Sequence, residues 1–512
     1  MLTLREAASL VPGSTILGDE HIAFDRISTD SRTVGPGDLF VALKGENFDA
    51  HDFLDQIAER QATAVLVSRS PADSSIPGLR VTDTRVALTD LAHGWRAKFA
   101  LPLVAVTGSN GKTTVKGMIA SIFVAAVGEG ARLATAGNLN NDIGVPLTLL
   151  RLNGSHKLAV VELGMNHPGE TELLARIAQP TIGLINNAQR EHQEFMSTVE
   201  AVALEHASVI HALPDGGHAV FPADDAYAGI WRVAATDRQI VDFALEQDEL
   251  VESGDAPAPT PPTEHGSRRA RARASALPPI DREAVAHAAV RGRRLPDGRL
   301  HIDTPAGAID VALNVIGDHN LRNALAAAAA AYSAGVSLDA IQAGLEGFEP
   351  VAGRLQRKQA KRAPFEGIAV IDDTYNANPD SMRAAIAVLA AAASPRVLVI
   401  GDMGEVGDYS AAFHREIGEF AREQGIDAMY ALGAESLASV QAFGAQARHF
   451  ETLDALLEAL LAAPLDVTHA VSGTAGETPR GTILVKGSRF MRMERVVQAL
   501  TLEAAPGSPG AH

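Results

Sequence analysis

The chain has 512 residues, carries a formal net charge of −18 and contains no cysteine. This length exceeds what one hydrophobic core supports, so we expect about three domains. The acidic balance argues against general binding to nucleic acid, and the lack of cysteine excludes disulfides, thiolate catalysis and cysteine-ligated zinc. The N-terminus has no signal-peptide pattern and no apolar run approaches the roughly 20 residues of a membrane span. We therefore expect a cytoplasmic protein. As a separate expectation, we take it to be a monomer.

Residues 1–100 read as a small α/β domain, with buried-strand candidates at 39–43 and 64–67 separated by glycine-rich turns. A cluster of small hydroxyls and a cation precedes the first of these strands and would suit a phosphate or a sugar. It could equally be a polar turn with a surface salt bridge. The residues are Ser28, Thr29, Ser31 and Arg32.

The segment 103–114, L-V-A-V-T-G-S-N-G-K-T-T, has the layout of a phosphate-binding loop. An apolar strand ends at Val106, glycines follow, and a helical pattern resumes after Lys112 and Thr113. Glycines let backbone N–H groups turn toward phosphate oxygens, the lysine reaches the β- and γ-phosphates, and the threonine hydroxyl binds magnesium. The first glycine of the general pattern is replaced here by Val106. The alternative is a chance glycine-rich turn.

The rest of a central domain, residues 101–345, places polar groups after further strands. Glu162 follows the apolar run 157–161, where a parallel sheet places a magnesium ligand. His192 follows a third strand at 181–187, and is either a metal ligand or an exposed loop histidine. An amide-rich turn could bind a polar substrate or simply its own backbone. It contains Asn138, Asn140 and Asn141.

Within this domain, residues 246–299 are rich in proline, arginine and alanine and poor in large apolar side chains. We predict a low-complexity, disordered insertion that includes at least 251–280, because such a composition cannot offset the entropy of ordering. It is either a solvated linker or an arginine-rich contact for an acidic partner or nucleic acid. Beyond it, Asn320 and Asn323 share one face near the start of a helix and can address one ligand together.

Residues 346–512 repeat the arrangement of a strand followed by polar residues, at 368–371, 397–400 and 482–485. Helical patterns separate these strands, which predicts a doubly wound, Rossmann-like parallel sheet. The strand ends carry acidic, amide and basic side chains, and we expect them to form a second face of one active site.

Together these motifs resemble the Mur ligase family, ATP-dependent amide-forming enzymes of peptidoglycan synthesis. The shared framework is T-G-S-N-G-K-T-T, E-L-G-M-N-H-P-G-E, G-D-H-N-L-R-N and the pair Gly353-Arg354. Within it, D-D-T-Y-N-A-N-P-D-S-M at 372–382, G-D-M-G-E at 401–405 and V-K-G-S-R at 485–489 are similar to the members that add D-alanyl-D-alanine to UDP-N-acetylmuramoyl-tripeptide. The resemblance covers nearly the whole chain except about 246–299.

The resemblance implies three domains, an N-terminal one for the UDP-sugar, a central one for ATP and a C-terminal ligase domain, which close around the substrates. It implies ATP and Mg²⁺, and an acyl phosphate that the amine of the dipeptide attacks. The nucleotide residues implied are Gly108, Ser109, Asn110, Gly111, Lys112, Thr113, Thr114, Asn320, Asn323, Arg354 and Asp373, with Thr113, Glu162 and His192 on the metals and Lys112, Glu162, His192 and Arg354 as the catalytic set. The substrate residues implied are Ser28, Ser31, Arg32, Asn47, Asn138, Asn140, Asn141, Tyr375, Asn376, Asn378, Lys486 and Arg489.

One position departs from the family. Many members carry a carbamylated lysine about a dozen residues past the histidine that matches His192, and it helps hold a second magnesium. Here that position is His206, next to Glu205. We therefore predict no carbamate, with His206, Glu205 or water in its place.

Two other functions fit parts of the sequence. A sibling ligase would add a single amino acid to a UDP-muramoyl chain, or glutamate to a folate. A phosphate-loop ATPase or kinase with a partner-binding C-terminal domain would release phosphate without D-alanyl-D-alanine.

Overall fold

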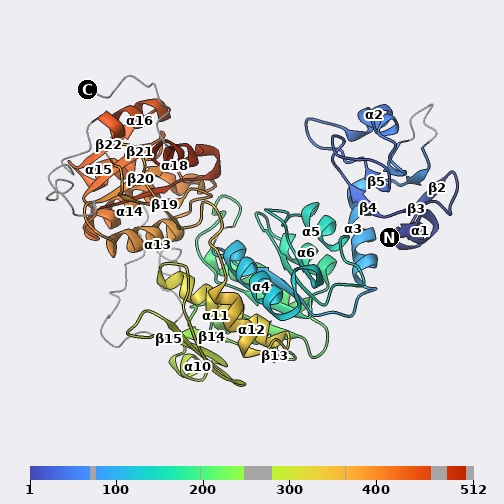
Figure 1. The fold of residues 1–512 in the computed structure, drawn as a ribbon, viewed down its shortest axis with the longest axis horizontal. Helices are drawn as coiled ribbons and strands as arrows, with labels where there is room; N and C mark the ends of the chain where they lie inside the picture. The colour runs from blue at the N-terminus through green and yellow to red at the C-terminus, as the bar shows by residue number, and fades with distance from the viewer. Residues whose placement is uncertain (70–75, 197, 247–278, 364, 463–480, 503–512) are drawn as a thin grey trace, which may run out of the picture.

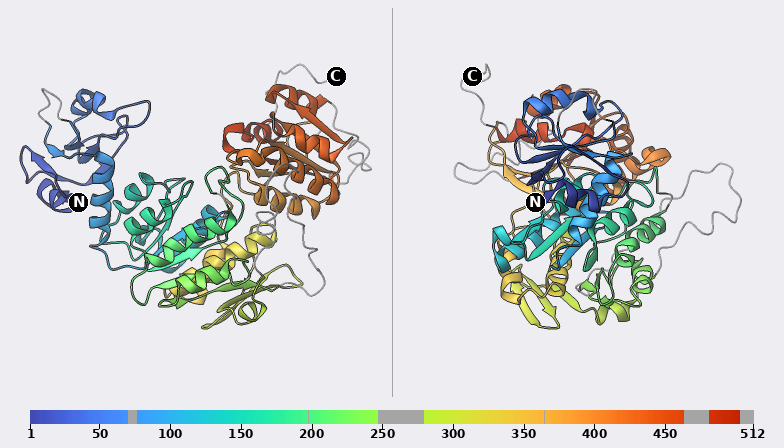
Figure 2. Two further views of the ribbon diagram at one scale, coloured as in Figure 1. Left: turned by 180° about the vertical axis from the view of Figure 1, so that it is seen from behind. Right: turned by 90° about the vertical axis from the view of Figure 1, so that its right-hand side faces the viewer.

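The computed structural model of the chain describes residues 1–69, 76–196, 198–246, 279–363, 365–462 and 481–502. They form three α/β units, with the N-terminal and C-terminal units at opposite ends and the central unit between them (Figure 1; Figure 2). The predicted three-domain α/β fold class is confirmed. Within these ranges, no helix is long and apolar enough to cross a membrane.

The N-terminal unit is built on a five-stranded sheet in the order β2-β7-β6-β5-β4, in which only the edge strand β2 is antiparallel to its neighbour. Every residue of β5 and β6 is buried, so these strands read in the sequence as continuous apolar runs. The elements are β1 (Leu2–Thr3), α1 (Leu4–Leu10), β2 (Thr15–Leu17), β3 (Ala23–Phe24), β4 (Arg26–Ser28), β5 (Asp38–Val41), α2 (Leu54–Glu59), β6 (Ala64–Val67), β7 (Gly78–Arg80) and α3 (Thr84–Arg96).

The central unit contains a six-stranded, fully parallel sheet in the order β13-β12-β11-β8-β10-β9. Its strands are β8 (Leu103–Thr107), β9 (Arg132–Ala134), β10 (Leu158–Glu162), β11 (Ile182–Ile185), β12 (His218–Val220) and β13 (Gln239–Ile240). Its helices are α4 (Lys112–Val127), α5 (Gly144–Leu149), α6 (Glu170–Ala178), α7 (Val199–His211), α8 (Ala228–Ala234), α11 (Asp318–Ser333) and α12 (Leu338–Glu346).

Strand β8 lies in the middle of this sheet and is buried on both faces. Leu103 and Ala105 pack into one core with α5, α6 and α7, whereas Val104 and Val106 pack into another with α4 and α11. Because parallel strands end at one edge, this burial places the residues that follow β8, β10 and β11 beside one another.

A four-stranded sheet, β14-β15-β16-β17, covers part of α11 and corrects one prediction. The predicted insertion at 246–299 is wrong for its C-terminal part, where Arg282–Ala286 forms α10 and Val290–Arg294 forms β15. Val290 and Gly292 are buried while the arginines between and after them are more exposed, so the arginine-rich composition concealed a strand. Residues 247–278 lie outside the described residues. The other strands are β14 (Phe243–Leu245), β16 (Leu300–Thr304) and β17 (Gly307–Val311).

The C-terminal unit has a second six-stranded sheet, in the order β18-β19-β23-β20-β21-β22, antiparallel only at the edge strand β18. Its strands are β18 (Gln356–Gln359), β19 (Ala369–Asp373), β20 (Arg396–Gly401), β21 (Ala428–Leu432), β22 (Ala447–Phe450) and β23 (Thr482–Lys486). Its helices are α13 (Pro379–Ala390), α14 (Ser410–Glu423), α15 (Leu437–Phe443), α16 (Leu453–Ala462) and α18 (Glu494–Thr501). The three predicted strands are β19, β20 and β23, side by side in the sheet.

The packing of β15 is testable. Val290 is fully buried, so Val290→Ala should lower the free energy of unfolding by about 2 kcal/mol through lost contacts and an unfilled cavity. Arg293→Ala on the same strand is the matched control, because that side chain is exposed and should change stability by less than about 0.5 kcal/mol. Denaturant unfolding measures both. Equal, negligible effects would place 290–294 outside the core.

Candidate active site

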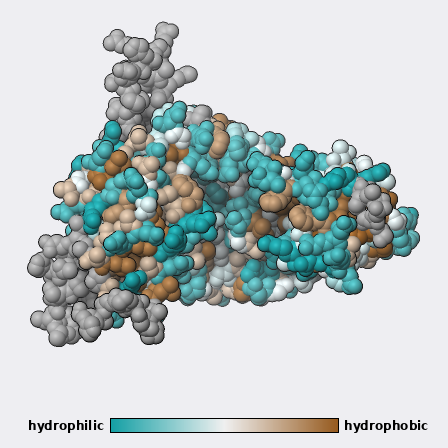
Figure 3. Space-filling model, turned by 90° about the horizontal axis from the view of Figure 1, so that it is seen from above, coloured by the Kyte–Doolittle hydropathy of each residue, from teal (hydrophilic) through white to brown (hydrophobic). Residues whose placement is uncertain are grey.

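A cavity of about 1290 Å³ lies where the carboxyl ends of the central and C-terminal sheets face each other. Seen from above, the surface is hollowed there and lined mainly by hydrophilic residues (Figure 3). The cavity brings together most of the predicted site residues from both units. These are Ser109, Asn110, Gly111, Lys112, Thr113, Thr114, Asn138, Asn140, Asn141, Glu162, His192, Asn320, Asn323, Arg354, Asp373, Tyr375, Asn376, Asn378, Lys486 and Arg489.

The loop between β8 and α4 is shaped to receive an anion. Gly108 and Gly111 have φ values of +130° and +82°, which side-chain-bearing residues rarely adopt. A Cβ on Gly111 would lie 2.5 Å from the amides of Asn186 and Asn323, so the loop also needs glycine for space. Lys112 Nζ donates to the carbonyls of Gly108 at 2.5 Å and Ser109 at 3.2 Å. The ammonium group thus lies inside the loop, at the N-terminus of α4, where phosphate is favoured.

Next to the loop, a threonine, a glutamate and an arginine come from three separate segments. Thr113 Oγ1 donates to Glu162 Oε1 at 3.0 Å, and Arg354 Nη2 donates to Thr113 Oγ1 at 2.9 Å. Asn140 Nδ2 also donates to Glu162 Oε1, at 2.9 Å, while the buried Glu162 Oε2 has no partner in the described residues. A hydroxyl and an under-coordinated carboxylate suit Mg²⁺, which takes few protein oxygens and completes its shell with phosphate and water.

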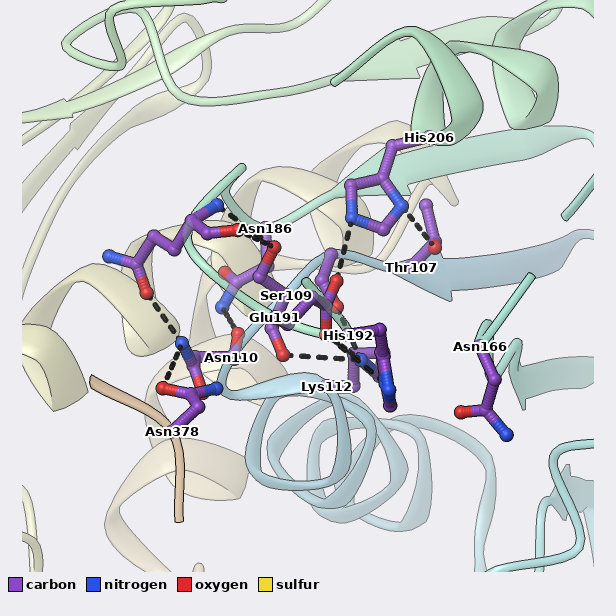
Figure 4. A network of polar contacts seen from close by, with 12 residues as sticks. Thr107, Ser109, Asn110, Lys112, Asn166, Asn186, Glu191, His192, His206 and Asn378 are labelled. Atoms are coloured by element: carbon purple, nitrogen blue, oxygen red, sulfur yellow. Dashed lines mark hydrogen bonds and ion pairs between the residues drawn. The ribbon is translucent and has the colours of Figure 1, made fainter. Parts of the chain in front are cut away.

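A buried carboxylate that sequence reasoning missed lies against the same lysine. Glu191 Oε2 is 3.5 Å from Lys112 Nζ, and Glu191 Oε1 is 3.3 Å from His206 Nε2 (Figure 4). The other ring nitrogen of His206 is 3.0 Å from Thr107 Oγ1. Burial opposes ionisation of Glu191, but the charge of Lys112 and the imidazole groups of His206 and His192 outweigh it and lower the pKa of the carboxyl to about 2. Glu191 is therefore ionised at neutral pH.

Several polar contacts join the C-terminal unit to this loop region. Asn110 and Asn378 exchange amide hydrogen bonds of 3.4 and 2.9 Å. Arg190 donates through its backbone and guanidinium to Asp380, at 2.6 to 3.0 Å, and through its guanidinium to Glu416 on α14, at 2.7 and 3.0 Å. These contacts connect the C-terminal unit to the phosphate loop and the segment after β11.

His192 forms a further contact between the units. Its Nδ1 is 2.8 Å from Glu405 Oε2, and this contact lowers the pKa of the Glu405 carboxyl. Both residues have positive φ, 47° for His192 and 59° for Glu405, which is unusual for residues other than glycine. No group of three or more histidines, aspartates or glutamates in the described ranges is already arranged to hold a metal ion.

The two asparagines of α11 share a buried face as predicted. Asn323 Nδ2 donates to Asn320 Oδ1 at 2.9 Å, and Asn186 Nδ2 donates to Asn323 Oδ1 at 2.8 Å. Asn320 Nδ2 donates to the carbonyl of Ile316 at 2.8 Å. Asn186 Nδ2 also donates to the carbonyl of Asn110, so these bonds connect α11 to the phosphate loop. A contact of the two asparagines with adenosine stays a prediction.

In the amide-rich turn, one asparagine binds the backbone of its own turn, whereas the other two face the cavity or its residues. Asn141 Oδ1 accepts the backbone N–H of Gly144 at 2.8 Å and so binds its own turn. Asn140 instead reaches Glu162, and Asn138 lines the cavity. The turn therefore connects to the site through Asn140.

On the C-terminal face, Asp373 and Lys486 form an ion pair of 2.7 Å, and Lys486 Nζ also donates to the carbonyl of Asn376 at 2.9 Å. The guanidinium groups of Arg354 and Arg489 lie 4.2 and 6.0 Å from the centre of the Tyr375 ring. Lys486 thus holds the 373–376 segment, and Tyr375 lies between two cations.

The four predicted residues of the N-terminal unit lie apart from this cavity. Ser31 and Asn47 line a separate cavity of about 450 Å³. Arg32 is exposed and pairs with Asp30 at 2.8 Å, and Ser28 Oγ accepts the backbone N–H of Asp30. For Arg32 and Ser28 the structure thus has the polar turn with a salt bridge, the alternative that the sequence left open.

Sequence reasoning also missed an acidic pair that lines the cavity after β12. Asp224 pairs with Arg322 of α11, and its Oδ1 is buried without a partner in the described part of the chain. Asp225 accepts backbone N–H groups from Tyr227 and Ala188, and burial raises the pKa of its carboxyl to about 6. Polar residues directly after a strand were the available signal.

His206 and Glu205 lie where many Mur ligases carry the carbamylated lysine. His206 is fully buried on α7 and faces Glu191. Glu205 points elsewhere, accepting the backbone N–H groups of Gly169 and Thr171 at 2.9 and 2.8 Å. Of the two residues, only His206 lies beside the phosphate loop.

Bicarbonate dependence tests the predicted absence of a carbamate. Since residue 206 is a histidine, ATP-dependent activity in CO₂-free buffer should equal that with added bicarbonate. Stimulation by several-fold would contradict this, and would direct attention to Lys116, a buried lysine whose pKa burial lowers. Lys116→Gln would then be expected to abolish the stimulation.

Comparison with known proteins agrees with this geometry. Family models match residues 106–260 (Mur ligase middle domain), 353–489 (Mur ligase, glutamate ligase domain) and 23–96 (Mur ligase family, catalytic domain). The chain is 39% identical over 501 residues to the UDP-N-acetylmuramoyl-tripeptide--D-alanyl-D-alanine ligase of Escherichia coli strain K12, covering 98% of each chain. It is 36% identical to the enzyme of that name from Haemophilus influenzae, with 95% of each chain covered. A crystal structure of MurF from Acinetobacter baumannii superposes with a TM-score of 0.80 at 34% identity, covering 97% of this chain and 98% of that one. The chain belongs to the Mur ligase family.

Proposed function

We propose that this protein is an ATP-dependent ligase that adds D-alanyl-D-alanine to UDP-N-acetylmuramoyl-tripeptide through an acyl phosphate. One observation carries the proposal: the phosphate loop, the amide-rich turn and the C-terminal loops after β19, β20 and β23 line a single cavity. Relatives named for this activity match almost the full length of the chain and of their own sequences.

On the central side, we assign the loop 108–114 and Lys112 to the ATP phosphates, and Arg354 to the γ-phosphate. The basis is that Lys112 lies inside the loop and that Arg354 reaches Thr113. Asn320, Asn323 and Asp373 are assigned to the adenosine. Thr113 and Glu162 would hold a magnesium ion, and His192 would contribute to a second. When bound, these ions would neutralise charge on the transferring phosphoryl group.

The reaction then needs positioning more than acid–base chemistry. The tripeptide carboxylate attacks the γ-phosphate, which gives an acyl phosphate and ADP. The amine of D-alanyl-D-alanine attacks the acyl carbon, loses a proton, and phosphate leaves. The asparagines of the 138–141 turn and Tyr375, Asn376, Asn378 and Arg489 are assigned to the reacting ends of the substrates. Contacts across the cleft, such as Asn110 with Asn378, would limit access of water to the acyl phosphate.

Lys486 is assigned a positioning role, because Asp373 and the carbonyl of Asn376 already occupy its ammonium group. The UDP-sugar is assigned to the N-terminal unit, at the cavity lined by Ser31 and Asn47, with Ser28 and Arg32 nearby in sequence. The tripeptide would extend from there toward the phosphate loop.

A phosphate-release assay with ATP, Mg²⁺ and UDP-muramoyl-tripeptide, with and without D-alanyl-D-alanine, tests the proposal. Release should need the dipeptide and coincide with a UDP-pentapeptide product. Lys112→Ala should lower the rate by about 10²–10³-fold, because the cation that faces the phosphates is gone. Lys157→Ala, an exposed lysine of the same unit, should leave it unchanged.

Release that is indifferent to the dipeptide would refute the ligase assignment and favour an ATPase or kinase. Ligation of single amino acids in place of the dipeptide would assign the protein to a sibling ligase.

A further inference from the structure

Glu191 stands out because its charge is difficult to accommodate once ATP is bound. Its carboxylate is 5% exposed, and the nearest ammonium group is Lys112 at 3.5 Å. This is the lysine assigned to the ATP phosphates. When the phosphates take up Lys112, a buried anion would face the phosphate anions at short range, in surroundings that screen charge poorly.

Neighbouring protein cations do not resolve this conflict. Arg190, the adjacent residue, is already bound by Asp380 and Glu416. Arg354 reaches Thr113 on the other side of the loop. A cation that arrives with the nucleotide would balance the charge of Glu191 without drawing on these arginines.

The atoms around Glu191 suit such a cation. Glu191 Oε1 and His206 Nε2 are buried, and neither has a hydrogen bond of acceptable geometry in the described residues. His192 Nε2 lies 3.9 Å from Glu191 Oε2 (Figure 4). A carboxylate and an imidazole thus lie side by side beside the phosphate loop, and both can ligate a divalent cation.

His206 is placed to orient this carboxylate. Its Nδ1 faces the Thr107 hydroxyl at 3.0 Å, which leaves Nε2 to face Glu191 Oε1 at 3.3 Å. Groups that contact a metal-binding carboxylate without contacting the metal commonly change the affinity for the metal.

We propose that Glu191, positioned by His206, is a magnesium-binding carboxylate that acts with His192 at the second metal site of this enzyme. The inference rests on the proposed function, because it assumes that ATP occupies the phosphate loop. It assigns the anionic charge of that site to a carboxylate of the chain itself.

The test counts bound Mn²⁺ by electron paramagnetic resonance, in the presence of a non-hydrolysable ATP analogue and UDP-muramoyl-tripeptide. Wild type should bind two Mn²⁺ and Glu191→Gln one, since the amide keeps the shape of the side chain but not its charge. His206→Gln should keep two sites, with the weaker one reduced about 10-fold in affinity. Glu205→Gln is the matched control and should keep both sites unchanged, because that carboxylate accepts the backbone N–H groups of Gly169 and Thr171 at the N-terminus of α6.

Two Mn²⁺ in Glu191→Gln at wild-type affinity, or a single Mn²⁺ in wild type, would overturn the proposal. Circular dichroism checks that the variants fold. If Glu191→Gln does not, Glu191→Asp replaces it, and should weaken the second site by about 10-fold because the shorter carboxylate is withdrawn. Metal counting needs no dipeptide, so it is independent of ligation. If the wild type binds two Mn²⁺ and Glu191→Gln binds one, but the wild type does not ligate D-alanyl-D-alanine, only the proposed function is refuted.

Discussion

The burial of strand β8 on both faces fixes the position of everything around the phosphate loop. Its alternate side chains pack into two different cores, so the strand cannot shift its register without exposing one of them. The chain must then turn at Gly108 and Gly111 to enter α4, which places Lys112 and Thr113 at the end of the strand. The neighbouring strands β10 and β11 end at the same edge and bring Glu162 and the loop at 186–192 to the same place.

In the C-terminal unit, on the other side of the cleft, adjacent parallel strands likewise end at one edge of the sheet. Strands β19, β20 and β23 are adjacent, so the loops that follow them share one edge. Polar contacts from Arg190, Asn378 and Glu405 join the two edges, and Ile316, just before α11, packs against the apolar core of the C-terminal unit. Interfaces of this polar kind are compatible with relative movement of domains. The candidate active site therefore lies where the edges of two separate sheets meet.

Acidic and basic side chains line the cavity together. Its cations Lys112, Arg354 and Arg489 each lie near a carboxylate, a hydroxyl or an aromatic ring. Eleven buried side-chain atoms in the described residues lack a hydrogen bond of acceptable geometry, and six of them belong to residues that line the cavity, among them Glu162, Glu191 and Asp224. Buried polar atoms are normally paired, so this concentration indicates a site whose remaining partners are ligands.

The sequence predicts the strands, the phosphate loop and the two polar edges because each depends on local pattern. Continuous apolar runs predict β8 and β20, and glycine spacing predicts the loop. Prediction from the sequence fails at β15, because an arginine-rich composition conceals the alternation of buried and exposed residues. There the arginines alternate with the buried Val290 and Gly292. It also misses Glu191, Glu405 and Arg190, because their roles arise from contacts between residues up to about two hundred positions apart. No local signal separates such residues from an ordinary polar loop.

The central claim, that both edges act on one acyl phosphate, is tested most directly by isotope transfer. The free carboxylate of UDP-muramoyl-tripeptide would be labelled with ¹⁸O and the inorganic phosphate released during ligation analysed by mass spectrometry. Attack of the carboxylate on the γ-phosphate predicts that one ¹⁸O atom from each labelled carboxylate appears in phosphate for each peptide bond formed. Phosphate without the label, alongside normal formation of the UDP-pentapeptide, would contradict the account.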